Sequence, residues 1–529
     1  MRTELFQPFS VGGYASAEGT SEYFRRLQST YGDWLLESWF RHIPAIDCLA
    51  SRLGFGSYRV KRTHRQHFDA LREALISGTN VIDTAAHFTD GESESLIGDV
   101  LSELFKANRI KREEIILISK CGYIQGSTLT EYGGNPPAFP GAVQVYPDLV
   151  YSLDSDFIVR EVENSRRRLG VDTIDVYLIQ NPENYLIYAQ AGGMDRAEAQ
   201  DRLLTKLKNA LETLHALIDK NWIRHTGISS NALTLPEEDY CALSIATILE
   251  QAPGSFRVIQ FPANLLEADY RFSRRTAGGN LMEYLQSKNL WSLSNRPLNA
   301  RYHGRLLRLA RMVDAPPDDG MTTEAEMNRL MGQLMETEAQ VLNFFSGFHF
   351  GFDERTPSPS LIIRHYRDRM NHAESFQAAL PHLRREIQKT MNQLYILAET
   401  QPQQFVLESL ARRTNAVLSM WEKYIDVRYH QNMETLEAQL CKLPRPGEQP
   451  LAVQAVLFLL SASVPQTVLV GMRTVPYVRQ LSRVYALPAP PMEAALTMVD
   501  TTENSLEQFS TDATDSPPAT FSDNSADPA

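Results

Sequence analysis

The stretch NVIDTAAHFTDGESESLIG, residues 80–98, carries most of the information about the architecture of this chain. An apolar run ends at Asp83, small residues follow, and a glycine–acidic turn leads into a segment with helical periodicity. This order is typical of a barrel strand that delivers polar side chains to an active-site face. Phe88 is unexpected there, because an apolar ring stands where the segment should present a proton donor.

The alternation of strand and helix continues beyond this stretch. Segments with the apolar spacing of helices separate short β-like runs, and Gly78 and Gly170 stand where two of the helices should end. The β-like runs are IILISK (115–120), IDVYLIQ (174–180), IRHTGIS (223–229), RVIQFPAN (257–264) and LWSLSNRP (290–297). Such alternation predicts parallel βαβ units, and right-handed crossovers leave either a closed barrel or an open doubly wound sheet.

The chain is expected to divide into five parts. Residues 1–50 form an N-terminal extension, 51–300 the alternating region, 301–450 a helical insertion, 451–487 a last helix and strand, and 488–529 a tail. The tail is rich in Pro, Ser, Thr and Asp, buries too little apolar surface to fold, and is predicted to be disordered. The insertion is interpreted as a cover for apolar surface, with a lid or a partner-binding surface as the alternatives.

Composition narrows the class of protein. With 529 residues, 43% hydrophobic and 9% aromatic, the chain has enough apolar side chains for a sizeable globular core. Its formal net charge of −12 argues against nucleic acid or an anionic membrane as a general partner. The four cysteines show no metal-type clustering and are interpreted as free thiols. No secretory signal is recognised at the start, and Pro465 interrupts the most apolar late stretch, so a soluble cytoplasmic protein is predicted.

Eight sequence blocks, taken together and in order, resemble those of aldo-keto reductases. They are LGFGSYRV, ALISGTNVIDTAAHF with GESESLIG, ISKCGY, LGVDTIDVYLIQNPE, TGISSNAL, VIQFPANLLE, NRPLNA and VLVGMRTVPYV. The resemblance covers about residues 51–300 and 451–485, and is to the branch with NPE after the fourth strand and NRPLN on the seventh. It implies a (β/α)8 TIM barrel that binds NAD(P)H at its C-terminal mouth and transfers a hydride to carbonyl compounds. No GxGxxG motif follows the first strand, which argues against a Rossmann domain.

In that family an aspartate, a tyrosine, a lysine and a histidine act together as a catalytic tetrad. The resemblance places the aspartate at Asp83 and the lysine at Lys120, but Phe88 stands at the tyrosine position and Gln180 at the histidine position. Phe88 has no hydroxyl, and losing a positioned general acid typically costs about 10²- to 10⁴-fold in rate. Gln180 can donate a hydrogen bond but carries no charge, and losing a strong oxyanion donor can cost about 10²- to 10³-fold.

Three other side chains are candidates for a replacement proton donor. His87 lies next to the expected acid position, but neighbours on an extended segment point to opposite sides. Tyr123 and Tyr185 follow the lysine and the NPE block. The alternative interpretation is a loop histidine in solvent and tyrosines packed on the rim. Asp83 and Lys120 have an alternative as well, a retained salt bridge that only ties two strands together.

The residues that would hold the nicotinamide end of the cofactor are better preserved than the tetrad. Ser229, Ser230 and Asn231 in GISSN resemble the block that holds the nicotinamide carboxamide in the family, and Gln260 in VIQFPAN matches a glutamine that contacts the same group. Asn295 stands where many relatives stack a tyrosine on the nicotinamide, so the stacking contact is not expected here.

The phosphate end follows the last strand. Gly471, Met472 and Arg473 in VLVGMR match the family's phosphate-binding residues. Glycine allows close backbone approach and a guanidinium suits a 2′-phosphate, which favours NADP(H) over NAD(H). Gln480 and Leu481 replace the Glu and Asn with which relatives often grip the adenine, so the adenine side departs from the family pattern.

Three functional hypotheses follow. The first is an NADP(H)-dependent oxidoreductase of small carbonyl compounds, with ordinary carbonyl reduction weakened or redirected by Phe88 and Gln180. The second is a non-catalytic NADP(H)-binding sensor or interaction module that acts on a protein partner through residues 301–450. The third is a scaffold that binds no cofactor. Nucleic acid, membrane and metal are not expected as partners.

Overall fold

The computed structural model describes residues 11–32, 37–131, 139–146, 149–271, 274–276, 279–302, 305–310, 324–346, 351–353, 356–367, 373–440 and 449–487. The tail predicted to be disordered, 488–529, lies outside the described residues. The chain divides into two compact units. One comprises Met1–Ala310 with Leu443–Ala529, and the other comprises Arg311–Lys442.

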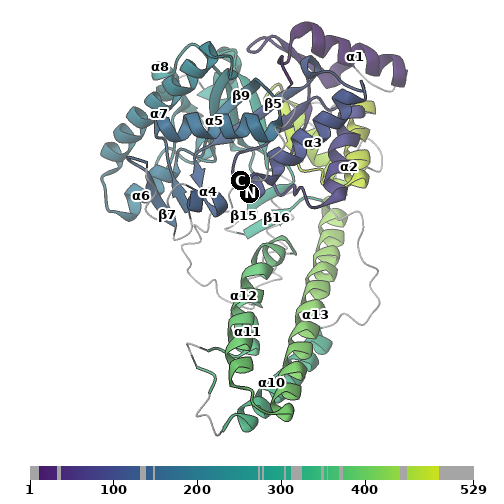
Figure 1. Ribbon diagram of the computed structural model, residues 1–529. Coiled ribbons are helices and arrows are strands. Elements are labelled where there is room, and N and C mark those ends of the chain that lie inside the picture. The colour runs from purple at the N-terminus through teal and green to yellow at the C-terminus, as the bar shows by residue number, and fades with distance from the viewer. Residues whose placement is uncertain are drawn as a thin grey trace, which may run out of the picture. The chain divides into compact units, whose positions relative to one another are not determined.

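Eight parallel strands close into a barrel in the first unit, so the fold is the predicted (β/α)8 barrel and not an open sheet (Figure 1). The strands are β3 (Leu53–Gly56), β4 (Val81–Asp83), β5 (Ile116–Cys121), β9 (Ile174–Gln180), β10 (Ile223–Ser229), β11 (Phe256–Pro262), β14 (Trp291–Asn295) and β17 (Thr467–Val470). The five β-like runs identified in the sequence correspond to β5, β9, β10, β11 and β14. The last strand, β17, pairs with β14 and with β3 and thereby closes the ring.

A helix follows each barrel strand, as the apolar spacing predicts. These helices are α2 (Arg65–Ile76), α3 (Glu92–Lys106), α5 (Ser155–Leu169), α7 (Arg196–Asp219), α8 (Ile245–Gln251), α9 (Leu281–Ser287), α14 (Leu451–Leu460) and α15 (Val475–Leu481). In α5 the side chain of Asp154 accepts hydrogen bonds from the first free backbone N–H groups, and Gly170, at φ 68°, ends the helix in the left-handed conformation.

The N-terminal extension closes the end of the barrel opposite the mouth. After α1 (Ala17–Tyr31), the antiparallel hairpin of β1 (Phe40–Ile43) and β2 (Cys48–Ser51) packs apolar side chains against those at the amino ends of the barrel strands. Buried Ile43, for example, belongs to one apolar cluster with Val81. A catalytic site is therefore expected at the carboxyl ends of the barrel strands, where barrels of this type carry their active sites.

Additional segments surround the mouth. A small sheet of β6 (Tyr123–Ile124), β7 (Val143–Tyr146) and β8 (Leu149–Tyr151) follows β5, with α4 (Gly126–Glu131) between β6 and β7. Helix α6 (Asn184–Ala191) follows β9, and the strand pair of β12 (Arg274–Thr276) and β13 (Gly279–Asn280) follows β11.

A hairpin of β15 (Asn299–Tyr302) and β16 (Arg305–Arg308) corrects the sequence interpretation after β14. The helical insertion was expected to begin at residue 301, but the chain first forms this antiparallel pair within the barrel unit. Its strands are too short for a period of two to be recognised in the sequence.

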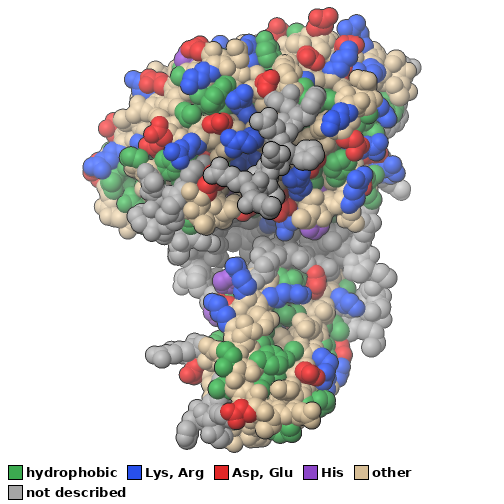
Figure 2. Space-filling model, viewed as in Figure 1, with side chains coloured by type: hydrophobic (Ala, Val, Ile, Leu, Met, Phe, Trp, Pro, Cys, Tyr) green, Lys and Arg blue, Asp and Glu red, His purple; other side chains and the backbone are tan. Residues whose placement is uncertain are grey.

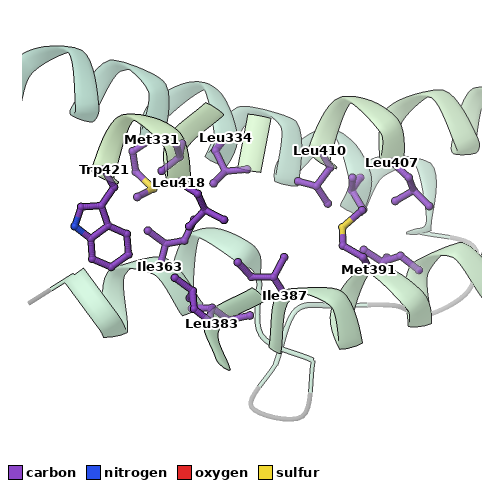
Figure 3. Packing of buried hydrophobic residues seen from close by; sticks show 14 of the residues in the cluster. Met331, Leu334, Ile363, Leu383, Ile387, Met391, Leu407, Leu410, Leu418 and Trp421 are labelled. Atoms are coloured by element: carbon purple, nitrogen blue, oxygen red, sulfur yellow. The ribbon is translucent and has the colours of Figure 1, made fainter. Parts of the chain in front are cut away.

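The second unit contains the predicted large helical region. Its helices are α10 (Glu324–Phe344), α11 (Pro359–Arg367), α12 (Ala373–Leu397) and α13 (Gln401–Leu440). Apolar side chains at helical spacing meet in a core of their own, which includes Met331, Leu334, Ile363, Leu383, Ile387, Met391, Leu407, Leu410, Leu418 and Trp421 (Figure 3). The rings of Phe376 and Trp421 meet edge to face with centroids 4.7 Å apart.

The surface carries mixed charge. Figure 2 shows basic and acidic side chains interspersed over the visible faces of both units. Of the helices in the described part of the chain, none has the length and apolar character that crossing a membrane requires. Cys48, Cys121 and Cys241 are free thiols, and Cys441 lies outside the described residues. Within the described ranges, no group of three or more His, Cys, Asp or Glu side chains is arranged to hold a metal ion.

Candidate active site at the barrel mouth

The carboxyl ends of β4 and β5 bring Asp83 and Lys120 into a buried ion pair. Lys120 Nζ lies 2.7 Å from Asp83 Oδ1 and 2.8 Å from Oδ2, and it donates to the Thr84 carbonyl oxygen at 2.8 Å. Lys120 is only 1% exposed. Burial raises the pKa of the Asp83 carboxyl and lowers the pKa of the Lys120 ammonium, because desolvation disfavours both charges, while each partner opposes the shift of the other. The pair holds a desolvated cation at the mouth.

Two further predicted residues extend this pair into a network. Gln260 Nε2 donates to Asp83 Oδ1 at 2.8 Å, and Ser229 Oγ donates to Gln260 Oε1 at 2.6 Å. The network therefore joins the carboxyl ends of four strands, β4, β5, β10 and β11. Both ends of the Gln260 amide are occupied inside the protein, which fixes the side chain of Asp83 toward Lys120.

The ring of Phe88 stands over the Lys120 ammonium. Lys120 Nζ lies 5.1 Å from the Phe88 ring centroid, and the Tyr58 ring packs against Phe88 edge to face at 5.2 Å. A cation is attracted to an aromatic face, but this ring has no proton to offer. Gln180 is buried at the carboxyl end of β9, and its backbone carbonyl oxygen accepts a hydrogen bond from the Tyr151 hydroxyl at 2.8 Å.

His87 is not the solvent-exposed loop histidine that the sequence suggested. The side chain is 5% exposed, and its ring centroid lies 4.5 Å from that of Tyr123 and 5.0 Å from that of Phe88. The backbone leaves the extended conformation at His87, with φ −86° and ψ −9°, so the rule that neighbouring side chains point apart does not apply. Neither ring nitrogen has a hydrogen-bond partner. Burial lowers the pKa of His87 to about 3, with Lys120 acting in the same direction, so the imidazole is neutral.

The two candidate tyrosines are also more buried than a rim position would allow. The Tyr123 hydroxyl accepts hydrogen bonds from Asn181 Nδ2 at 2.7 Å and from Asn184 Nδ2 at 2.9 Å. Burial raises the pKa of Tyr123 above its usual value, which makes this phenol a poorer acid. Tyr185 is buried on α6, with Lys206 Nζ 5.6 Å from its ring centroid.

A left-handed turn carries the chain from Phe88 into α3. Thr89 (φ 49°), Asp90 (φ 60°) and Gly91 (φ 81°) follow one another in the left-handed region, where a β-branched residue such as threonine is strained. Thr89 Oγ1 donates to the Val60 carbonyl oxygen at 2.5 Å, and Asp90 Oδ1 accepts from the Ser127 backbone N–H at 3.0 Å. These bonds hold the turn and with it the neighbouring ring of Phe88.

Glu183, in the NPE block, organises the loop after β10 and was not among the predicted site residues. Its carboxylate accepts a hydrogen bond from Ser230 Oγ at 2.7 Å and from the Asn231 backbone N–H at 2.9 Å. Burial raises the pKa of Glu183 to about 7, because desolvation outweighs these hydrogen bonds. The available signal in the sequence was a carboxylate three residues after the end of a fully buried strand, β9.

Glu183 should make the stability of the barrel depend on pH. Its folded-state pKa of about 7 lies above the usual 4.5, so its stabilising contribution is complete below about pH 4.5 and is lost as the pH rises through 7. The difference corresponds to about 3 kcal/mol. We expect the urea midpoint of the parent to fall between about pH 5 and pH 8 relative to that of Glu183→Gln, which cannot ionise. Parallel pH profiles of the two proteins would contradict this assignment.

The predicted phosphate end lies after β17. A Cβ added to Gly471 would meet no atom nearer than the Gly56 carbonyl oxygen at 4.0 Å, so the backbone at Gly471 is open to a close approach. The Met472 side chain is fully buried, so any contact of this residue with a cofactor would come from its backbone.

Arg473 belongs to a cluster of three guanidinium groups. Burial first, and then the neighbouring charges of Arg308 and Arg59, lower the pKa of Arg473 to about 10. Arg59 follows β3 and Arg308 ends the β15–β16 hairpin, so the three positions are far apart in the sequence. Sequence reasoning missed Arg59 and Arg308, because nothing in the sequence indicates that the hairpin approaches the end of β17. Like charges gathered in a partly buried position suit a bound anion.

Buried polar atoms without partners lie along the same side of the mouth. Asn231 Oδ1 after β10, Asn295 Oδ1 on β14, Thr474 Oγ1 after β17 and Gln480 Oε1 on α15 have no hydrogen-bond partner. Such atoms are normally satisfied by protein or water. Asn231, Asn295 and Thr474 lie at or just after the carboxyl ends of β10, β14 and β17, and Gln480 lies on α15. This placement fits a long polar ligand that runs from Asn231 toward Arg473.

Comparison with known proteins finds one family model that matches the barrel. Residues 52–300 match the model of the Aldo/keto reductase family.

Among curated proteins, the chain is 29% identical over 147 residues to NADH-specific methylglyoxal reductase of Escherichia coli (strain K12), covering 26% of this chain and 40% of that protein. It is 26% identical over 226 residues to Aldo-keto reductase YhdN of Bacillus subtilis (strain 168), covering 42% of this chain and 52% of that protein. The chain thus spans about half the length, or less, of these two relatives. Among solved structures, it is similar to the holo form of an aldo-keto reductase from Bacillus halodurans, with a TM-score of 0.45, 16% identity, and coverage of 87% of this chain and 95% of that chain.

Proposed function

We propose that the barrel binds NADP(H) and acts as an oxidoreductase on small carbonyl compounds, with ordinary carbonyl reduction weakened or redirected. The observation that carries this proposal is the buried Asp83–Lys120 pair with a phenyl ring in place of a phenol 5.1 Å from the ammonium. The charge that stabilises a developing oxyanion is retained, whereas the group that would pass on a proton is missing.

The residues at the mouth fit a dinucleotide phosphate. Ser230 and Asn231 would hold the nicotinamide end, supported by the unsatisfied Asn231 Oδ1. The open backbone at Gly471 and the guanidinium of Arg473, with Arg59 and Arg308 near it, would hold the phosphates. Three guanidinium groups favour the 2′-phosphate of NADP(H) over the hydroxyl of NAD(H). The Escherichia coli relative is NADH-specific by name, so the preference for NADP(H) rests on these arginines alone.

When bound, this cofactor would supply a hydride to the carbonyl carbon. Lys120, desolvated and held by Asp83, would stabilise the negative charge that develops on the carbonyl oxygen. Gln260 would keep Asp83 in place through its hydrogen bond at 2.8 Å. Phe88 lies against the ammonium, 5.1 Å from Nζ to the ring centroid, but transfers no proton, so substrates that need strong acid catalysis should react slowly.

Substitution of Arg473 by glutamine tests cofactor binding. Fluorescence titration should show a Kd for NADPH about 10- to 100-fold higher for Arg473→Gln than for the parent, because a hydrogen bond to a charged group contributes about 1.5 to 3 kcal/mol. The Kd for NADH should change little. Arg479→Gln is the matched control, since Arg479 lies on α15, the helix that begins two residues after Arg473, and pairs with Glu73 at the surface. Equal losses for both cofactors, or no saturable signal in the parent, would contradict the proposal.

A second candidate function is an NADP(H)-binding sensor or interaction module that acts through the helical unit. The separate hydrophobic core of Arg311–Lys442 favours it, because a unit with its own core can serve as a docking element. A parent protein that binds NADPH but reduces no carbonyl compound would support this candidate. For either function we propose a cytoplasmic location, which the unbridged Cys48, Cys121 and Cys241 support.

A further inference from the structure

His87 presents two buried ring nitrogens that no protein group satisfies. Buried polar atoms without partners are rare in folded proteins, and each one calls for a ligand, a bound water or a functional reason. The side chain is 5% exposed, and neither Nδ1 nor Nε2 has a hydrogen-bond partner. The functional assignment above does not use this residue. A buried imidazole without protein partners is suited to hydrogen bonding with a polar atom of a bound ligand.

The position of His87 points to that ligand. Aromatic rings follow one another along the mouth, with centroid distances of 5.2 Å from Tyr58 to Phe88, 5.0 Å from Phe88 to His87 and 4.5 Å from His87 to Tyr123. The imidazole thus lies beside the ring that covers the Lys120 ammonium. The Tyr123 hydroxyl already accepts hydrogen bonds from two asparagines, whereas the nitrogens of His87 are unoccupied.

We infer that His87 donates a hydrogen bond to the oxygen of the hydride acceptor, and that the acceptor is an activated carbonyl compound whose reduced oxygen is weakly basic. This inference rests on the proposed function and adds to it a residue that contacts the substrate and a substrate class.

The chemistry follows from a neutral imidazole. With its pKa lowered to about 3, His87 is uncharged near neutral pH and donates a hydrogen bond without giving up a proton. In the reaction the carbonyl carbon forms a C–H bond with the hydride from reduced nicotinamide, and the electron pair of the C=O π bond moves to the oxygen. The oxygen, held by His87 and by the charge of Lys120, then takes a proton from water. The oxygen stays anionic through the transition state. Electron-withdrawing substituents on the carbonyl compound stabilise this charge and should therefore raise the rate.

A pair of substituted aldehydes tests the substrate class. We expect the parent to reduce 4-nitrobenzaldehyde with NADPH much faster than 4-methoxybenzaldehyde. The ratio of the two kcat/KM values should be at least about 10-fold larger for the parent than for Phe88→Tyr, in which a phenol can protonate the oxygen. Equal ratios would overturn the assignment of the substrate class.

Substitution of His87 tests the contact. His87→Ala should lower kcat/KM for 4-nitrobenzaldehyde by about 10²-fold, the usual effect of losing an oxyanion donor. His87→Gln, which keeps an N–H donor, should recover part of the loss. His225→Ala is the matched control, because His225 is a partly buried histidine with a pKa lowered to about 4 on β10, outside the candidate site. It should leave the rate unchanged.

Two measurements separate this inference from a structural role and from failure of the proposed function. His87→Leu replaces the unsatisfied nitrogens by apolar atoms of similar volume and should keep or raise the thermal midpoint. A lower midpoint with a proportional loss of activity would overturn the inference. NADPH binding by fluorescence should be the same for the parent and His87→Ala. If NADPH binds but His87→Ala reduces 4-nitrobenzaldehyde like the parent, the inference fails and the cofactor proposal stands. If NADPH does not bind, both fail.

Discussion

Phe88→Tyr should raise kcat/KM for 4-methoxybenzaldehyde by about 10²- to 10⁴-fold, the usual contribution of a positioned general acid. The Phe88 ring already stands over the Lys120 ammonium, with 5.1 Å between Nζ and the ring centroid. A hydroxyl on this ring would have a buried cation beside it, and a cation stabilises the phenolate form and so lowers the pKa of a phenol. The gain is measured from initial rates of NADPH oxidation, with the aldehyde as the varied substrate.

Three control variants make this result specific. Phe88→Leu removes the ring without adding an acid and should give no gain. Phe88→Tyr combined with Lys120→Met should lose most of the gain, because the new phenol then lacks its cation. Gln180→His, added to Phe88→Tyr, should raise the rate further by adding a stronger hydrogen-bond donor to the substrate oxygen. If Phe88→Leu were as active as Phe88→Tyr, the ring would be a steric block and the account of the missing acid would be wrong.

Lys120→Met should lower the free energy of unfolding of the barrel by about 3 to 5 kcal/mol, because removing one partner of a buried ion pair leaves the other charge uncompensated. Asp83 would keep the hydrogen bond from Gln260 at 2.8 Å but lose both contacts with the ammonium. The change is measured by urea unfolding followed by tryptophan fluorescence. A Trp421→Phe background removes the tryptophan signal of the helical unit, because the other tryptophans belong to the barrel unit.

The double variant Asp83→Leu with Lys120→Met should recover most of this loss, since replacing a buried pair by apolar side chains is often neutral. Lys111→Met is the matched surface control. Lys111 Nζ pairs with Glu22 Oε1 at 3.0 Å, and both side chains are exposed, so the unfolding midpoint should not move. A Lys120→Met variant as stable as the parent would show that the pair is not charged in the folded state.

The fold could be predicted from the sequence because the longer barrel strands and the helices between them have strong local signals. Strands such as Ile174–Gln180 are mostly apolar and entirely buried, and α5 begins at the capping residue Asp154 and ends at Gly170. The hairpin at Asn299–Tyr302 and Arg305–Arg308 was missed, since four-residue strands carry no period that can be separated from loop.

The site residues could be predicted where the pairing of neighbouring strands alone brings two side chains together. Asp83 and Lys120 follow from β4 and β5 being neighbours, and Gln260 from its place at the end of β11. Burial is a property of the assembled structure, and it is what makes His87 neutral and unsatisfied and raises the pKa of Glu183. A single sequence gives the type of a residue but not its environment, so the burial of His87 and the role of Glu183 could not be predicted.

The position of β17 in the sequence determines when the barrel can close during synthesis of the chain. This strand hydrogen-bonds to β14 on one side and to β3 on the other, and the whole of Arg311–Lys442 is translated between β14 and β17. The helical unit packs on contacts within its own span, Arg311–Lys442, whereas the β3–β17 pairing joins strands from opposite ends of the barrel unit, and such distant pairing forms slowly. Until residues Thr467–Val470 leave the ribosome, the nascent barrel carries open edges on β3 and β14. That interval is when the chain depends most on protection from aggregation.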